Sequence, residues 1–182
     1  MMNREKVAHI LRAIAGVTGE TKLALVGSAT VLLRAKNIPA AMLNTNEIDV
    51  FSPNATDEEM FVDLVSGSLG RGSQFDQTFN YFGDGVTSRT AKMPSDWRER
   101  ATIVEVPTLH GIEVLVPDLN DVALAKMLAW REKDRNWLQA GVRSKILDPT
   151  VMRGRLSLLP ETEAPREEVQ RRMDAVAAYA SK

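Results

Sequence analysis

Apolar side chains recur along the chain in two spacings, and the alternation between these spacings outlines the predicted elements. Residues 1–17 carry apolar side chains every three or four positions, which predicts a helix. Leu23–Val26 is a short apolar run typical of a buried strand, and helical spacing returns from Ala29 to about Lys36. Residues 47–51 alternate polar and apolar side chains, the pattern of a strand with one solvated face.

The rest of the chain continues this mixture and then becomes helical. Thr56, followed three residues later by Glu59, predicts the start of a helix. Thr102–Val106 and Ile112–Val116 are rich in β-branched residues and predict a hairpin with a five-residue connection. Beyond this hairpin, helical spacing and capping residues predict a helical part over residues 117–182.

Two carboxylates stand out in the alternating strand. Glu47 and Asp49 are two residues apart, so in a strand both side chains lie on one face, away from the core side of Ile48. Adjacent carboxylates repel unless a positive charge lies between them, and Mg²⁺ is commonly held by one or two carboxylates with substrate phosphates. Gly27-Ser28 follows the first strand, where it offers backbone N–H groups to a phosphate. A solvated edge strand and an ordinary turn are the alternatives, but the combination favours a site for a metal-bound nucleotide.

The composition indicates a globular protein of one domain, or of one domain with a small appendage. The chain has 182 residues, 44% of them hydrophobic, and a formal net charge of −1. It contains no cysteine, which excludes disulfides and thiolate metal sites, and its two histidines, His9 and His110, lie far apart in sequence. No apolar run is as long as a membrane helix, and the N-terminus does not resemble a signal peptide. We therefore expect a cytoplasmic protein without membrane contact.

The order of these motifs resembles that of the polymerase-β-type nucleotidyltransferases. Gly27-Ser28, followed by Thr45-x-Glu47-Ile48-Asp49-Val50, is similar to their signature of a G-G or G-S turn before a strand with two acidic residues. The resemblance implies an α+β fold with a nucleotidyltransferase-like mixed β-sheet flanked by helices. Residues 1–116 would form the catalytic core, and residues 117–182 would form a helical part that completes the cleft.

Later motifs resemble a bacterial branch of these enzymes that is related to the AbiEii and MenT toxins of toxin–antitoxin systems. In that branch a D-G-V segment and a G-W-x-x-R segment precede a helix of the form D-L-x-x-x-K-L-x-x-x-R-x-K-D. The matching segments here are residues 84–86, 97–100, 121–126 and 131–134. The chain departs from the pattern at Glu47, where aspartate is usual, and at Asp96, where glycine is usual.

The resemblance assigns roles to individual residues. Ser28, next to Gly27, would bind phosphate, and Glu47 and Asp49 would hold Mg²⁺. A third carboxylate often lies on a later strand of such catalytic domains. Glu105 and Glu113 both lie in strand patterns and both remain candidates, whereas Asp84-Gly85 is typical of a turn.

Lys126 and Asp134 complete the expected site. By the resemblance, Lys126 would contact the nucleotide phosphates, and Asp134 would be a further acidic member of the pocket. Lys126, Trp130 and Asp134 are spaced by four, which predicts that they follow one side of a continuous helix. The alternative for Lys126 is a side chain that extends along apolar surface to reach solvent.

The function that the resemblance implies is Mg²⁺-dependent transfer of a nucleoside monophosphate from an NTP to an acceptor hydroxyl. The toxin relatives suggest tRNA as the acceptor and a cognate antitoxin as a partner. Seven basic residues could form a local patch for RNA: Arg131, Lys133, Arg135, Arg143, Lys145, Arg153 and Arg155. A non-catalytic protein that binds a nucleotide or a partner through the same cleft is the main alternative, and a plain interaction module is the other.

Overall fold

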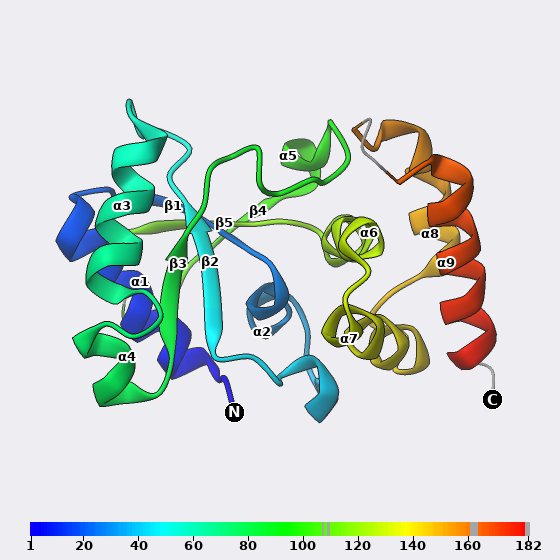
Figure 1. Ribbon diagram of the computed structural model, residues 1–182, viewed down its shortest axis with the longest axis horizontal. Coiled ribbons are helices and arrows are strands. Elements are labelled where there is room, and N and C mark those ends of the chain that lie inside the picture. Colours follow the sequence, from blue (N-terminus) through cyan, green and yellow to red (C-terminus); the bar gives the residue numbers. More distant parts are fainter. Residues whose placement is uncertain (107, 109, 161–163, 181–182) are drawn as a thin grey trace.

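A mixed β-sheet stands between two groups of helices in the computed structural model, which describes residues 1–106, 108, 110–160 and 164–180 (Figure 1). The strands are β1 (Lys22–Val26), β2 (Glu47–Phe51), β3 (Phe82–Gly85), β4 (Thr102–Val104) and β5 (Glu113–Val116). The helices are α1 (Arg4–Thr18), α2 (Val31–Arg34), α3 (Glu58–Leu69), α4 (Gln74–Phe79), α5 (Trp97–Arg100), α6 (Leu119–Ala129), α7 (Glu132–Arg143), α8 (Pro149–Gly154) and α9 (Arg166–Ala180). The predicted α+β fold with a mixed, helix-flanked sheet and a helical C-terminal part is confirmed.

The sheet has the strand order β3-β2-β1-β5-β4. Neighbours β1 and β2 are antiparallel, as are β4 and β5, whereas β1 with β5 and β2 with β3 are parallel. The predicted hairpin is therefore present as β4 and β5, although both strands are shorter than expected and the connection between them is longer. Two residues of that connection, Pro107 and Leu109, lie outside the described residues.

Side chains alternate between the two faces of the sheet, as strand geometry requires. On one face, Ile48 and Val50 of β2 pack in a buried cluster with α1 and α3. The glycines of β3 belong to this face, because a Cβ at Gly83 would lie 3.2 Å from Ile10 Cδ1 and one at Gly85 would lie 2.8 Å from the Cα of Val62. Because side chains alternate along a strand, Asp84, which lies between these two glycines, points to the opposite face.

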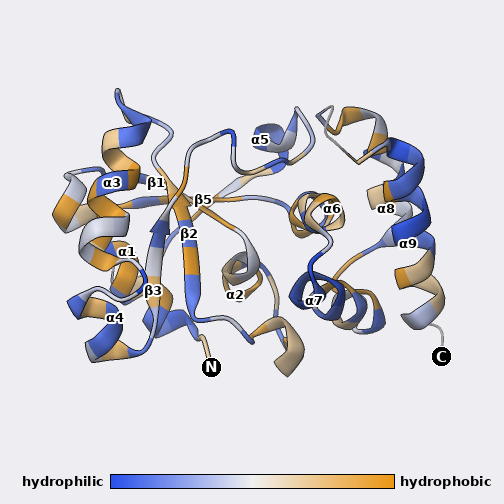
Figure 2. Cartoon of the chain, viewed as in Figure 1, coloured by the Kyte–Doolittle hydropathy of each residue, from blue (hydrophilic) through white to orange (hydrophobic). Residues whose placement is uncertain are grey.

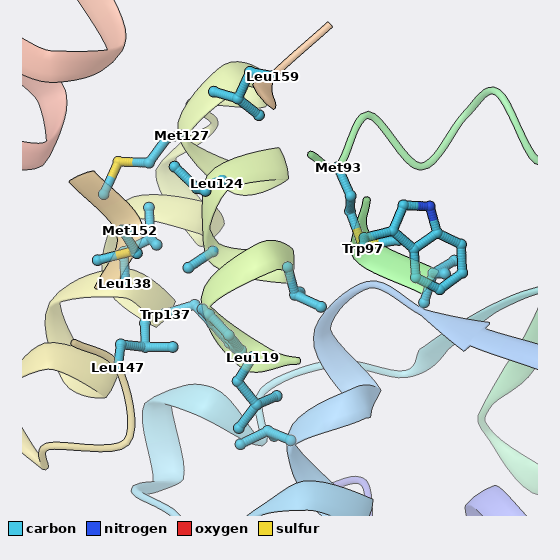
Figure 3. Close-up of a cluster of buried hydrophobic side chains, with 14 of the residues drawn as sticks. Met93, Trp97, Leu119, Leu124, Met127, Trp137, Leu138, Leu147, Met152 and Leu159 are labelled. Atoms are coloured by element: carbon cyan, nitrogen blue, oxygen red, sulfur yellow. The ribbon is translucent and has the colours of Figure 1, made fainter. Parts of the chain in front are cut away.

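The opposite face is covered by the C-terminal helices, with α6 packed against α7, α8 and α9. Figure 3 shows the buried cluster between them, including Leu124 and Met127 of α6, Trp137 of α7 and Met152 of α8. Hydropathy follows this arrangement, since α6 is mostly hydrophobic and the outer helices α7 and α9 are largely hydrophilic (Figure 2). Among the described residues, no helix has the length and apolar character needed to cross a membrane.

Two local predictions are wrong. The N-cap of α3 is Asp57 and not Thr56, because the Asp57 carboxylate accepts the hydrogen bond from the backbone N–H of Met60. Lys126 and Asp134 do not share a continuous helix: α6 ends at Trp130, which has a left-handed φ of 50° and donates its N–H to the carbonyl of Lys126. The chain turns there, so α6 and α7 pack against each other instead of forming one rod.

Candidate active site

Three carboxylates meet on the face of the sheet that is covered by the C-terminal helices. Pairing of β1 with β2 sets Val26 opposite Asp49, and pairing of β2 with β3 sets Asp49 opposite Asp84. Glu47 lies two residues before Asp49, so it shares the same face. Carboxylate oxygens of Glu47, Asp49 and Asp84 all lie within 4.8 Å of one another. These three residues are the acidic triad.

The triad concentrates negative charge in a partly buried place. Burial, reinforced by the charges of Glu47 and Asp84, raises the pKa of Asp49 to about 7. Burial and the charge of Glu47 also raise the pKa of Asp84. A divalent cation would relieve this repulsion, and a set of carboxylate oxygens suits hard cations such as Mg²⁺.

The turn after β1 lies beside the triad. Gly27 has a φ of 71°, in the region that favours glycine, and the chain then enters a 3-10 turn at Ser28–Thr30. The Thr30 hydroxyl donates to the Gly27 carbonyl over 2.7 Å, which fixes the turn. The turn lies directly against Asp49, since a Cβ at Gly27 would be 2.0 Å from the Asp49 Oδ2 atom, and its backbone can approach a bound ligand closely.

A buried lysine links this turn to the C-terminal helices. The Nζ atom of Lys126 donates to the Ser28 hydroxyl and to Asp134 Oδ1, each over 2.9 Å. Arg131 Nε donates to the other oxygen of Asp134 over 2.8 Å, and the Arg131 backbone N–H also donates to that oxygen. Lys126 also lies 5.1 Å from the ring centroid of Trp137. The left-handed turn between α6 and α7 is what brings Lys126 and Asp134 into contact.

The two charges of this buried pair support each other. Burial lowers the pKa of Lys126, and the charge and hydrogen bond of Asp134 oppose that shift. Burial alone would raise the pKa of Asp134, but the hydrogen bond from Arg131 and the charge of Lys126 hold it below its ordinary value. Asp134 is therefore an anion at neutral pH, and its charge stabilises the ammonium form of Lys126.

A cleft of about 760 Å³ connects these groups. Its floor holds the acidic triad with Gly27 and Ser28, and one wall is the side of α6 that carries Lys126. Other parts of the wall come from residues 90–93 and from the start of α9 at Glu168 and Arg172. This volume is in the range of small-molecule sites, and the lining combines the acidic triad with several lysine and arginine side chains and with aliphatic side chains.

Comparison with known protein families agrees with this geometry. Residues 5–181 match the model of a family described as "Nucleotidyltransferase of unknown function (DUF6036)". The chain belongs to this nucleotidyltransferase family. Comparison with curated proteins and with solved structures gave no match. The family description supports a transferase and does not extend to the AbiEii- and MenT-related branch.

Most of the predicted site residues of this nucleotidyltransferase meet in the cleft. Gly27, Ser28, Glu47, Asp49 and Lys126 all line it, although they come from a turn, a strand and a helix that are far apart in sequence.

Asp134 occupies a different place from the one expected. It is fully buried behind Lys126 and does not line the cleft, because it caps the first turn of α7 and binds Arg131. Asp134 therefore positions the lysine, and the acidic group that joins Glu47 and Asp49 in the cleft is Asp84.

The third carboxylate was missed at the sequence level. Glu105 is exposed after β4, and Glu113 forms an exposed ion pair with Lys22, so neither belongs to the triad. Asp84 takes that place because Asp84-Gly85 lies in β3 and is not a turn. The sequence feature that marks this carboxylate is the D-G-V motif at residues 84–86.

The predicted basic patch is only partly present in this nucleotidyltransferase. Arg155 turns inward to Asp118 and Asp121, and Arg153 pairs with Asp174. Arg131 and Lys133, in contrast, are exposed and line the cleft. Lys92 does so on the other wall. Positive charge is thus gathered at the cleft and not along α8.

Proposed function

We propose that this protein is a Mg²⁺-dependent nucleotidyltransferase that moves a nucleoside monophosphate from an NTP to an acceptor hydroxyl. The observation that carries the proposal is the convergence of Glu47, Asp49 and Asp84 beside Gly27-Ser28 in a cleft that also holds Lys126. In this proposal residues 1–116 supply the carboxylates, and residues 117–182 supply the lysine and complete the cleft.

The acidic triad would hold the metal. Its oxygens lie close enough together to share one cation. Burial, reinforced by the charges of Glu47 and Asp84, raises the pKa of Asp49, and a bound cation would stabilise its ionised form. Mg²⁺ bound there would neutralise charge on the phosphates and polarise the phosphoryl group. Glu47 is longer than the usual aspartate, but its carboxylate reaches the other two in this structure.

The remaining residues would bind the triphosphate and its leaving group. The acceptor oxygen forms a bond to the α-phosphorus, the bond from that phosphorus to the β-bridging oxygen breaks, and pyrophosphate leaves. A carboxylate of the triad takes the proton of the acceptor hydroxyl. Lys126 and the backbone of Gly27 and Ser28 stabilise the negative charge that moves onto the leaving group. Asp134 keeps Lys126 charged and in place for this role.

The acceptor we favour is the hydroxyl of an RNA, with tRNA as the first candidate. Two observations support it: the exposed cations Arg131, Lys133 and Lys92 line the cleft, and the motif order resembles that of toxins from bacterial toxin–antitoxin systems. A cognate antitoxin and a cytoplasmic location belong to the same proposal. A protein that binds the nucleotide without transferring it is the alternative.

A transfer assay with α-labelled nucleotides tests the proposal. Each of the four NTPs is incubated with Mg²⁺ and total tRNA, and label on RNA or on the protein is measured for the wild type and for Asp49→Asn. Asp63→Asn is the control, because Asp63 is an exposed aspartate on α3 outside the cleft. We expect transfer with at least one nucleotide, a loss of roughly a hundredfold or more in Asp49→Asn, and no change in the control.

Calorimetry with the same nucleotides separates the alternative from the proposal. Binding of a nucleotide with Mg²⁺, but no transfer to RNA, to the protein or to small hydroxyl compounds, would support the non-catalytic alternative. Transfer that survives in Asp49→Asn would contradict the proposed site.

A further inference from the structure

The three cations that face the acidic side of the cleft differ in how they are held. Lys126 is buried and donates to both Ser28 and Asp134. Arg131 is tied to the same Asp134 carboxylate. Lys133 is different, because its side chain is 53% exposed and its Nζ atom contacts Glu47 Oε2 over 3.2 Å.

The charge around these groups is unevenly balanced. Asp134 alone is matched by two cations, Lys126 and Arg131. The acidic triad carries up to three negative charges, and within the described part of the chain the one ion pair to it comes from Lys133. Lys133 therefore neutralises the charge that a divalent cation would neutralise in the loaded protein.

We propose that Lys133 is an exchangeable counter-ion: it pairs with Glu47 while the metal site is empty, and it moves to the phosphates when metal and nucleotide bind. The inference rests on the proposed function, because it takes the triad to be a metal site. It assigns to Lys133 a coupling role between the two ligands, and the resemblance gives no role to that residue.

The local structure allows this movement. Lys133 lies in the first turn of α7, whose backbone is fixed by the hydrogen bond from the Arg131 N–H to Asp134. The side chain beyond it is a flexible four-carbon stem with a compact ammonium group that can bind phosphate oxygens as a point charge. Lys133 also lines the same cleft as Gly27 and Ser28, so an ammonium released from Glu47 stays next to the expected phosphates.

The exchange has a thermodynamic consequence. Without nucleotide, a divalent cation must displace the ammonium from Glu47, so Lys133 weakens metal binding. With a phosphate ligand present, the displaced ammonium gains a new partner, so Lys133 strengthens binding of the phosphate ligand. Because binding free energies are linked, metal and phosphates then favour each other's binding through this one side chain.

Lys133→Met tests the inference by two binding measurements with opposite expected signs. Free Mn²⁺ is followed by electron paramagnetic resonance to obtain the affinity of the metal alone. Calorimetry measures binding of tripolyphosphate, a probe that does not depend on the base, to protein that is already saturated with Mg²⁺. We expect Mn²⁺ to bind about two- to fivefold more tightly to Lys133→Met, the size of an exposed ion pair, and tripolyphosphate to bind more weakly by a similar factor.

Two variants serve as controls. Lys22→Met removes an ion pair of the same length, 3.2 Å, with a side chain that is 52% exposed and lies outside the cleft, so we expect no change in either affinity. Lys133→Arg keeps the charge and should bind both ligands much as the wild type does. Mn²⁺ affinity that is equal or weaker in Lys133→Met, or unchanged binding of tripolyphosphate, would overturn the inference.

The same experiment distinguishes this inference from the proposed function. If Asp49→Asn loses Mn²⁺ binding and Lys133→Met behaves as the wild type, the metal site stands and the exchange role of Lys133 is wrong. If Asp49→Asn binds Mn²⁺ as the wild type does, the triad is not the metal site and both proposals fail.

Discussion

A Cβ atom at Gly27 would lie 2.0 Å from the Oδ2 atom of Asp49. The turn after β1 and the central carboxylate of the triad are therefore packed so closely that no side chain fits between them. Gly27 also has φ of 71° and ψ of −156°, a region that is essentially restricted to glycine. The backbone that we expect to face the phosphates and the carboxylate that we expect to hold the metal thus depend on the same glycine.

Gly27→Ala should displace Asp49 and abolish metal binding, because the new methyl group would overlap the Asp49 carboxylate. The backbone strain should also lower the free energy of unfolding by about 1–2 kcal/mol or more. Gly19→Ala is the control: Gly19 has φ of 75°, but a Cβ there would meet no atom within 4 Å. We expect strain without loss of metal affinity in that variant, as measured by urea unfolding and Mn²⁺ titration. Equal Mn²⁺ affinities in the two variants would contradict the role given to the close contact.

Asp84→Asn should weaken Mn²⁺ binding by about tenfold or more, because it removes one charged oxygen donor from the triad. Glu113→Gln provides the comparison, since Glu113 forms an exposed ion pair with Lys22 away from the cleft. Titration of both variants with Mn²⁺ decides between the two carboxylates. A loss of affinity in Glu113→Gln and none in Asp84→Asn would show that the third ligand is misassigned.

Asp84 also illustrates where sequence reasoning ends. The strands β1 and β2 could be predicted because their apolar residues are buried and leave a clear pattern. In β3 the inward positions are Gly83 and Gly85, which are small because α1 and α3 approach the strand closely. Without apolar side chains at these two positions, the segment looks like a turn, and its carboxylate is not recognised as part of the site.

The helical part, residues 117–182, shows a second limit of prediction from the sequence. Gly27, Ser28, Glu47, Asp49 and Lys126 were identified from motifs, and they do meet in one cleft. The turn at Trp130 was not identified, because a bulky residue with positive φ leaves no glycine or proline in the sequence to mark it. The contact between Lys126 and Asp134 depends on that turn, so its geometry could not be derived from their spacing.

Asp134→Asn should destabilise the fold by about 3–5 kcal/mol, because it leaves the buried ammonium of Lys126 without its counter-charge. Asparagine can still accept the capping hydrogen bond at the start of α7. The loss of stability would therefore measure the missing charge and not a weakened helix start. The exposed pair Arg153–Asp174 offers a matched comparison, for which Asp174→Asn should cost less than about 1 kcal/mol. Urea unfolding measures both values, and similar losses in the two variants would argue against a special role of the buried pair.

The raised pKa of Asp49 predicts how stability depends on pH and metal. Without metal, folded Asp49 keeps its proton up to about pH 7, whereas the unfolded chain releases it near the ordinary value of 3.8. The folded state then binds more protons in this window, so its free energy of unfolding should fall as pH rises through it. Because Mg²⁺ needs the ionised carboxylate, its stabilising effect should be small near pH 5 and larger above about pH 7.

Thermal unfolding with and without Mg²⁺, from about pH 5 to about pH 8.5, measures this dependence. In Asp49→Asn the group cannot titrate, so both the fall in stability and the pH-dependent effect of Mg²⁺ should diminish. A metal-free wild type that gains stability relative to Asp49→Asn as pH rises would have the opposite sign and would contradict the account.

The most direct measurement is a crystal structure of the protein soaked with Mn²⁺ and recorded at a wavelength where manganese scatters anomalously. The account predicts an anomalous peak among the carboxylates of Glu47, Asp49 and Asp84, beside Gly27, and no such peak in Asp49→Asn. A peak at another place in the molecule, with none among these three carboxylates, would contradict it.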